Sequence, residues 1–159
     1  MVMRDIRNVI LSIYYHFKDG FADWDRVAIL DSYSNVDKSL PCIVIDYVIN
    51  NAKHLEHGNP AYNDTTETIA LQIYASAVGM SELRDMMDKC LSLLEEKITW
   101  IDYNNAFPND PSYDPITQKK GLLIVDGTPS AEPLKFGDES TDEINRFRGV
   151  VTFNIKREN

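Results

Sequence analysis

The chain has 159 residues, of which 43% are hydrophobic and 26% charged, the composition of a soluble globular protein with a buried core. Acidic residues outnumber basic ones 25 to 16, and the net charge of −9 excludes a protein that wraps nucleic acid, because phosphate binding needs clustered Lys and Arg. No segment approaches the roughly 18–20 apolar residues that span a bilayer, and the N-terminal stretch lacks a signal-peptide cleavage site. We expect a protein made in a cytoplasm.

Two cysteines are present, Cys42 in an apolar run and Cys90 in a helical pattern. They lack the CxxC spacing of metal and redox sites, and two isolated cysteines give no framework of disulfides. The sequence therefore predicts buried thiols in a reducing compartment.

The first predicted element is an amphipathic helix that ends at Gly20, a residue type that tolerates the left-handed C-terminal conformation. Its apolar residues recur at spacings of three and four: Val2, Ile6, Val9, Ile10, Ile13, Tyr14 and Phe17. The opposite side is predicted to carry Arg4, Asp5, Arg7 and Asn8. Residues 21–39 give a mixed signal, in which residues 27–33 fit a short strand.

A hairpin of two strands follows. Leu40 and Pro41 precede CIVIDYVI, whose β-branched and aromatic residues predict a central, largely buried strand. The next run, ETIALQIYA, alternates and is predicted to be half-buried. One set of its side chains, Ile69, Leu71 and Ile73, faces the core, and the other set is Thr68, Ala70, Gln72 and Tyr74.

The second predicted helix begins at Ser81, as N-cap, and carries one apolar stripe: Leu83, Met86, Met87, Cys90, Leu91, Leu94 and Ile98. Residues 102–119 are rich in Pro, Asn and Asp and are predicted to be a loop. Strands are predicted at GLLIVDG and in RFRGVVTFNIKRE, joined by a long polar connection. We predict an α+β fold over residues 1–159, with a single mixed or antiparallel sheet, two main helices packed on one face, and long polar loops.

The tip of the hairpin holds the one candidate metal motif, HLEH, with His54, Glu56 and His57. Residues 58–60 are Gly-Asn-Pro and break the helix that two such ligands need, and a zinc site takes three or four ligands. Nucleophile-elbow, P-loop and dinucleotide motifs are absent from the sequence. Asp46 interrupts an apolar strand, where a buried unpaired charge is costly, so we predict that it faces solvent or another subunit. We predict no catalytic residue, metal or cofactor.

Two long polar stretches, residues 51–66 and 126–146, are joined to the predicted strands. Ordering such a stretch costs about 1–2 kcal/mol per residue in backbone entropy, and contact with a partner commonly offsets that cost. We therefore predict that both are arms that contact a subunit or partner. The candidate contact residues are His54, Leu55, Glu56, His57, Tyr62, Phe136, Asp138 and Glu139.

The order and pattern of these elements resemble the tail-terminator (tail-completion) proteins of long-tailed bacteriophages. The segments that carry the resemblance are LPCIVIDYV, ETIALQIYAS, SELRDMMDKCLSLLEEKI, and LLIVDGTPSAEPL through FRGVVTFNIKR. The resemblance covers nearly the whole chain, and residues 102–119 depart from the pattern.

The resemblance implies a structural virion protein and not an enzyme. Its copies would form a homo-hexameric ring on the head-proximal end of the tail tube, stop tube polymerisation and offer a docking surface to the neck. The implied partners are other copies of the chain, the tail tube protein and a neck or head-completion protein, with no membrane and no cofactor. DNA would only pass through the lumen, which a negative charge favours by repulsion. The implied location is the tail or neck of the virion, after assembly in the host cytoplasm.

Three alternatives stay open at this point. The first is a neck or head-completion protein that joins head and tail in the same particle. The second is a small metal-dependent enzyme or metal-sensing module built on HLEH. The third is a host adaptor domain that binds a peptide at a sheet edge.

Overall fold

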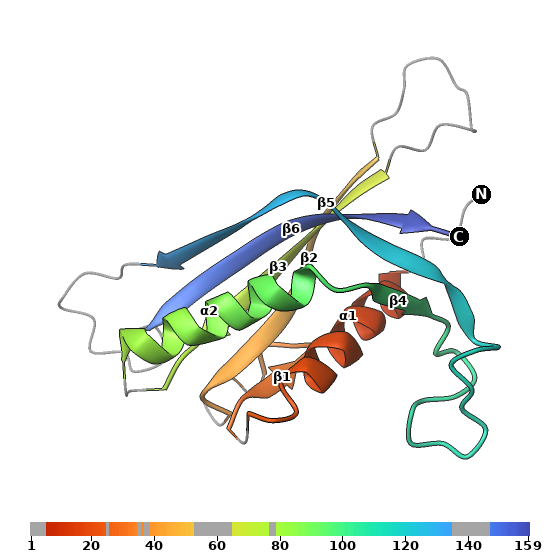
Figure 1. Ribbon diagram of the computed structural model, residues 1–159, viewed down its shortest axis with the longest axis horizontal. Coiled ribbons are helices and arrows are strands. Elements are labelled where there is room, and N and C mark those ends of the chain that lie inside the picture. Colours follow the sequence, from red (N-terminus) through yellow and green to blue (C-terminus); the bar gives the residue numbers. More distant parts are fainter. Residues whose placement is uncertain are drawn as a thin grey trace.

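Two helices and six strands make up the described part of the chain (Figure 1). The structure is a computed structural model that describes residues 6–24, 26–34, 36, 39–52, 65–76, 79–134 and 147–159, with the backbone alone at residues 49–52 and 65–66. The elements in chain order are α1 (Ile6–Gly20), β1 (Ala28–Leu30), β2 (Cys42–Ala52), β3 (Thr65–Tyr74), α2 (Met80–Leu94), β4 (Ile98–Ile101), β5 (Lys119–Leu134) and β6 (Arg148–Glu158).

The strands form one sheet in the order β1-β2-β3-β6-β5-β4. β1 runs parallel to β2, and every other neighbouring pair is antiparallel. Both helices lie on the same face of this mixed, curled sheet (Figure 1). The predicted α+β class, with one sheet and two helices on one face, is confirmed.

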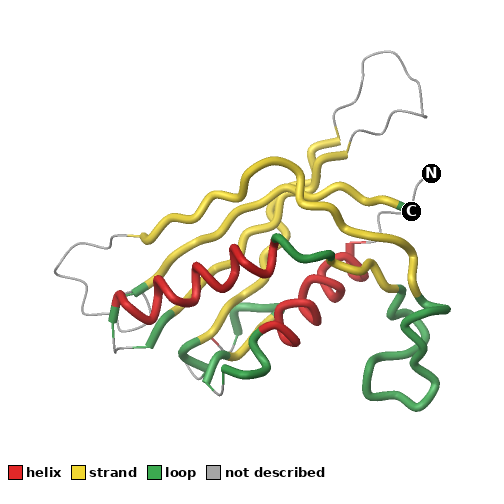
Figure 2. The backbone as a smooth tube through the Cα atoms, viewed as in Figure 1, coloured by secondary structure: helices red, strands yellow, loops and turns green. Residues whose placement is uncertain are grey.

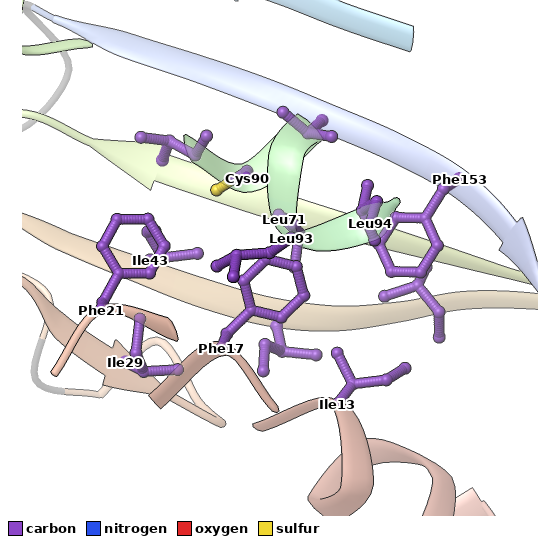
Figure 3. Packing of buried hydrophobic residues seen from close by; sticks show 14 of the residues in the cluster. Ile13, Phe17, Phe21, Ile29, Ile43, Leu71, Cys90, Leu93, Leu94 and Phe153 are labelled. Carbon is purple, nitrogen blue, oxygen red and sulfur yellow. The ribbon is translucent and has the colours of Figure 1, made fainter. Parts of the chain in front are cut away.

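The main core lies between the helices and the inner face of the sheet (Figure 3). Phe17 of α1 lies beside Leu93 of α2, Ile13 belongs to the same cluster, and the inward side chains of the central strands close it from the sheet side. Cys90 is part of this core, and Cys42 is buried on the outer face, so the prediction of two buried thiols is confirmed.

α1 confirms the predicted helix from Ile6 onward, with two differences in detail. Asn8, predicted on the polar side, is buried because it holds the chain that follows β4. Gly20 ends the helix without a positive φ. A Cβ there would lie 2.4 Å from Cδ2 of Leu93, so glycine serves the close packing of α1 on α2.

α2 begins after Gly79, which is the N-cap without a side-chain hydrogen bond, so the prediction of Ser81 as N-cap was wrong. The helix ends at Leu94, and Ile98, predicted as its last apolar residue, opens β4. None of the described helices is long and apolar enough to cross a membrane.

β5 is much longer than the predicted GLLIVDG strand and continues to Leu134. Its pairing with β6 shifts between Asp126 and Ser130, where Gly127 takes a φ of 79°, in the left-handed region that glycine favours. Residues 126–134 of the polar connection predicted over residues 126–146 are therefore strand, and residues 135–146 lie outside the described part.

The face of the sheet turned away from the helices carries a smaller apolar cluster. Val36 packs there against Cys42 and Val44 of β2 and Tyr74 of β3. Because this cluster buries Tyr74, β3 is covered on both faces at that end and not half-buried as predicted.

Candidate interaction surface

All of the contact residues predicted from the sequence lie outside the part of the chain that the structure describes. These are His54, Leu55, Glu56, His57 and Tyr62 in the hairpin tip, and Phe136, Asp138 and Glu139 in the second stretch. Their role as contacts stays a prediction, and the described residues next to them define the surface that carries them.

The first part of that surface is a two-stranded ribbon formed by the far ends of β2 and β3. β3 pairs with β6 only from Glu67 onward, whereas its pairing with β2 continues to Ala52 opposite Thr65. The ribbon therefore extends past the helices and past β6 (Figure 1). Residues 51–52 and 65–66 of the predicted contact arm 51–66 belong to its strands, and residues 53–64 between them lie outside the described residues.

An ion pair between a buried carboxylate and a partly exposed arginine closes the base of this ribbon. Glu67 is fully buried, and Nε of Arg157 donates a hydrogen bond of 2.8 Å to its Oε2 while Nη2 of the same arginine donates to Oε1. The hydroxyl of Tyr47 donates a further hydrogen bond of 2.8 Å to Oε1. These residues come from β3, β6 and β2 in turn. Three strands are thus fastened together where the ribbon leaves the sheet.

Trp100 of β4 lies beside this ion pair. The guanidinium carbon of Arg157 is 5.4 Å from the centroid of its ring, and Nζ of Lys120 is 4.8 Å from that centroid. Two cations over one indole are favourable contacts that link β4, β5 and β6 at this point.

Asp46 lies on the outer face of the sheet, away from the helices, which agrees with the prediction that it avoids the core. The hydroxyl of Tyr33 donates a hydrogen bond of 2.9 Å to its Oδ2. Burial and this hydrogen bond raise the pKa of Tyr33 above its ordinary value, so the phenol stays neutral and acts as the donor.

The second part of the surface is the segment 102–118, which the sequence marked as a loop of unassigned role. It stands out from the body of the protein beyond β4 (Figure 2). Oδ1 of Asn8 accepts a hydrogen bond of 2.9 Å from the backbone of Tyr103, and Nδ2 of Asn8 lies 3.4 Å from Oδ1 of Asp102. A buried helix side chain thereby fixes the start of the loop.

Gln118 braces the two ends of the loop against each other. Its Nε2 donates hydrogen bonds of 2.8 and 3.1 Å to the carbonyls of Asp102 and Ala106, and its Oε1 accepts one of 2.9 Å from the backbone of Asp114. One side chain thus satisfies three backbone groups that no strand or helix satisfies.

Three aspartates stabilise the local turns of the same loop. The carboxylates of Asp102, Asp110 and Asp114 accept hydrogen bonds of 2.8 to 2.9 Å from nearby backbone N–H groups. The donors to Asp102 and Asp114 lie two residues after the aspartate, as in an Asx turn, and the donor to Asp110 lies three residues before it.

Aromatic rings attach the loop to α1. Tyr103 packs 5.1 Å from Tyr15 of the helix, and Phe107 and Tyr113 stack on it at 6.2 and 6.3 Å between centroids. Burial and the neighbouring phenol of Tyr113 raise the pKa of Tyr103, so the Tyr103 phenol stays uncharged up to high pH. The loop is held in one conformation although it lacks regular secondary structure.

Two grooves flank this loop. One, of about 320 Å³, lies between α1, β4 and the loop, and polar side chains of both signs line it, among them His16, Asp19 and Lys97. The other, of about 660 Å³, runs along α1 and is mostly apolar, with Ile6, Arg7, Ile10, Leu11, Asp31 and Phe107 as its lining. We refer to this second one as the α1 groove.

No group of three or more His, Cys, Asp or Glu side chains within the described residues is arranged to hold a metal ion. The histidine of α1, His16, has its Nε2 2.7 Å from the carbonyl oxygen of Leu93, a contact within the fold. The HLEH motif lies outside the described residues, so the metal alternative stays a prediction.

Comparison with known proteins finds no family model that matches the chain and no similar curated protein. The function is therefore argued from the surface just described and from the sequence pattern.

Two features of this surface were missed in the sequence. Glu67 stands in phase with Ile69 and Leu71, and Arg157 in phase with Ile155, so a charged residue of each sign occupies a core-facing position of its strand. That phase was a usable signal for a buried ion pair. The hydrogen bonds of Gln118 could not be predicted in this way, because the backbone groups that it contacts are brought together only by the fold.

Proposed function

We propose that the chain is a structural, non-catalytic subunit of a long-tailed bacteriophage, the tail terminator that caps the head-proximal end of the tail tube. The sequence pattern supports this, because the order of a helix, a hairpin with a long tip, a second helix and two closing strands resembles that family. The α+β fold with both helices on one face of a single sheet agrees with the proposed class.

The observation that carries the proposal is the ribbon of β2 and β3 with its closed base. The pairing of β2 with β3 continues past the last residue of β3 that pairs with β6, and the chain places the ion pair of Glu67 and Arg157 at that point. Such a base fixes the direction in which the far ends of β2 and β3 leave the sheet. An assembly protein needs an arm with a fixed direction, because the neighbouring subunit lies at a fixed angle.

A ring of six copies would use this arm in head-to-tail contacts. Those contacts join two different surfaces of the same chain and close by rotation. The net charge of −9 suits a ring through which DNA slides during ejection, because repulsion prevents binding in the lumen. The tail tube protein and a neck protein would bind opposite faces of the ring.

Removing the gene from the phage tests the proposal. We expect tail tubes of excessive length and heads without tails, seen by electron microscopy of the lysate, and rescue by the wild-type gene supplied in trans. Tails of normal length joined to heads would contradict the proposal. Tails of normal length that stay separate from filled heads would also contradict it and would favour the head–tail joining alternative.

A further inference from the structure

We propose that an extended peptide segment of a partner protein binds as an added strand at the open edge of β4. This edge lines the groove of about 320 Å³ between α1, β4 and the loop of residues 102–118. The proposal goes beyond a role in a phage tail, because it depends on the backbone of β4 and not on the resemblance to a protein family.

β4 is the last strand of the sheet and pairs on one side only, with β5. The backbone groups of successive residues in a strand point to opposite sides. At the end of β4, the N–H of Asp102 donates a hydrogen bond of 2.8 Å to the carbonyl of Gln118, on the side of β5. The N–H of Ile101 points the other way and donates one of 3.0 Å to Oγ of Ser12 in α1. The N–H and the C=O of Thr99, two residues earlier, therefore face away from β5.

The backbone of Thr99 has no hydrogen-bond partner among the described residues, and its side chain is exposed. A free N–H and a free C=O on one residue are the groups with which a strand edge binds another strand. They identify the ligand as a polypeptide backbone. The α1 groove has no such group, because none of the described residues that line it belongs to a strand.

The shape of the groove suits an extended chain. α1 forms one wall with Ser12, His16 and Asp19, which lie about one helical turn apart. β4 forms the other wall with every second residue from Lys97 to Ile101. The groove therefore follows the strand over its whole length, as a peptide that pairs with β4 must do.

Tyrosine rings at the loop end of the groove offer a contact for an apolar side chain. Tyr103 lies 5.1 Å from Tyr15 and 6.3 Å from Tyr113 between ring centroids, and all three residues line the groove. A bound strand turns every second side chain to the same face. We expect an apolar residue at the position that meets these rings, because buried aromatic surface contributes strongly to binding.

A protein other than a second copy is the proposed source of the segment. Two edges of the chain itself suit the groove poorly. β1 has three residues, and Pro129 and Pro133 remove N–H groups from the edge of β5 beyond Leu123. A contact between two copies is the competing outcome.

Hydrogen exchange measured by NMR on the full nitrogen-15-labelled chain tests the edge, with short peptides selected from a random displayed library as the probe. In the free protein the amide of Thr99 should exchange about tenfold faster than that of Trp100, which faces β5. A selected peptide should slow the exchange at Thr99 by about tenfold, since the new hydrogen bond protects its N–H.

Failure to select any peptide would overturn the proposal, as would a bound peptide that leaves the exchange at Thr99 unchanged. Protection of Thr99 that rises with protein concentration in the absence of peptide would also overturn it and would assign the edge to a second copy.

Thr99→Pro removes the N–H that the added strand would bind. Proline is tolerated where the N–H points away from the neighbouring strand, so the variant should keep its fold, which is checked by exchange in β5 and β6. Its affinity for the selected peptides should fall about tenfold, as for the loss of one backbone hydrogen bond. Thr99→Ala is the matched control, because it keeps the N–H, and its affinity should stay within about threefold of wild type. Equal affinities of the two variants would contradict strand addition.

A second measurement leaves the protein unchanged. N-methylation of a selected peptide at alternate residues removes the donors on one side of its strand. One of the two alternate sets should abolish binding to the wild-type chain, and the other should weaken it far less. Equal effects of both sets would overturn the proposal even if Thr99→Pro fails to fold. None of these outcomes depends on tail assembly, so the proposed function stands or falls separately.

Discussion

The ribbon of β2 and β3 and the loop of residues 102–118 both extend from the same body, yet they are held in opposite ways. The ribbon has a regular ladder of strand pairing and one buried ion pair at its base. The loop has no regular secondary structure, and a set of side chains each satisfies one to three of its backbone groups.

The two extensions are therefore expected to lose their structure in different ways. One substitution in such an ion pair is strongly destabilising, because removing the arginine leaves the buried carboxylate without its cation. Hydrogen bonds spread along a loop fail one at a time, and each failure is small and local. The ribbon should therefore couple to global stability and the loop to local order.

The largest effect is expected for Arg157→Met, which leaves the carboxylate of Glu67 buried without its cation. We expect the free energy of unfolding to fall by about 3–5 kcal/mol in urea denaturation. The matched control is Lys156→Met, because Lys156 pairs with Asp126 at 3.6 Å with both side chains about half exposed. That change should cost about 0–1 kcal/mol. An equal decrease in the free energy of unfolding in the two variants would show that the ion pair at the ribbon base contributes no more than an exposed one.

Replacing both partners sharpens the same comparison. In the double variant Glu67→Met and Arg157→Met no charge stays buried, and apolar side chains of similar length fill the site. Most of the stability lost in Arg157→Met should return, since a buried pair and a packed apolar pair are often close in free energy. A double variant as unstable as the single one would show that the geometry, and not the charge, holds the base.

In the loop the largest single effect is expected for Gln118→Ala, which removes three hydrogen bonds to backbone. We expect the local stability of the loop to fall by about 1–3 kcal/mol. The change should appear as faster hydrogen exchange within residues 103–117 and not in the sheet. Thr117→Ala is the control, because its hydroxyl has only a 3.5 Å contact. A hydrogen-exchange rate that rises as much in β2 and β3 as in the loop would contradict a local effect.

A smaller effect is expected for Asp114→Ala, which removes the acceptor for the N–H of Ile116. The expected loss is about 0.5–1.5 kcal/mol, measured by thermal unfolding. Asp114→Asn keeps an acceptor oxygen and should restore most of it. A variant with asparagine as unstable as the one with alanine would assign the effect to charge instead of to the turn.

The reactivity of the two buried thiols distinguishes a variant that loosens only the loop from one that destabilises the whole fold. Burial raises the pKa of Cys42 from 9.0 to about 11 and also raises that of Cys90, so the folded state disfavours both thiolates. Below about pH 9 the thiol of Cys42 is protonated in both the folded and the unfolded state, and it does not reduce the free energy of unfolding. As the pH rises toward 11 the unfolded state loses the proton first, so the free energy of unfolding falls. At pH 8, iodoacetamide should leave wild type and Gln118→Ala unmodified and should modify Arg157→Met fastest. Equal rates in the two variants would contradict the comparison.

The sequence predicted the helices, the hairpin and the fold class because alternation and helical spacing are local signals. β4 was missed because Ile98 is four residues after Leu94 and continues the apolar stripe of α2. The end of β5 was missed because both faces of residues 126–134 are largely exposed, so the run shows no alternation of apolar and polar residues.

The candidate surface was less predictable, because its contacts join distant parts of the chain. Asn8 meets Tyr103 across 95 positions, and no periodicity links the two. The loop could be recognised as a loop from its Pro, Asn and Asp content, but its rigidity depends on where α1 lies. Only the phase of Glu67 and Arg157 in their strands carried information about the surface in advance.

We propose that the chain caps one end of a phage tail tube, and this can be examined by imaging gold-labelled protein on purified tail tubes. We expect label at the head-proximal end alone, at a stoichiometry of one ring per tube. Label along the tube, at the distal end, or on heads without tails would contradict it.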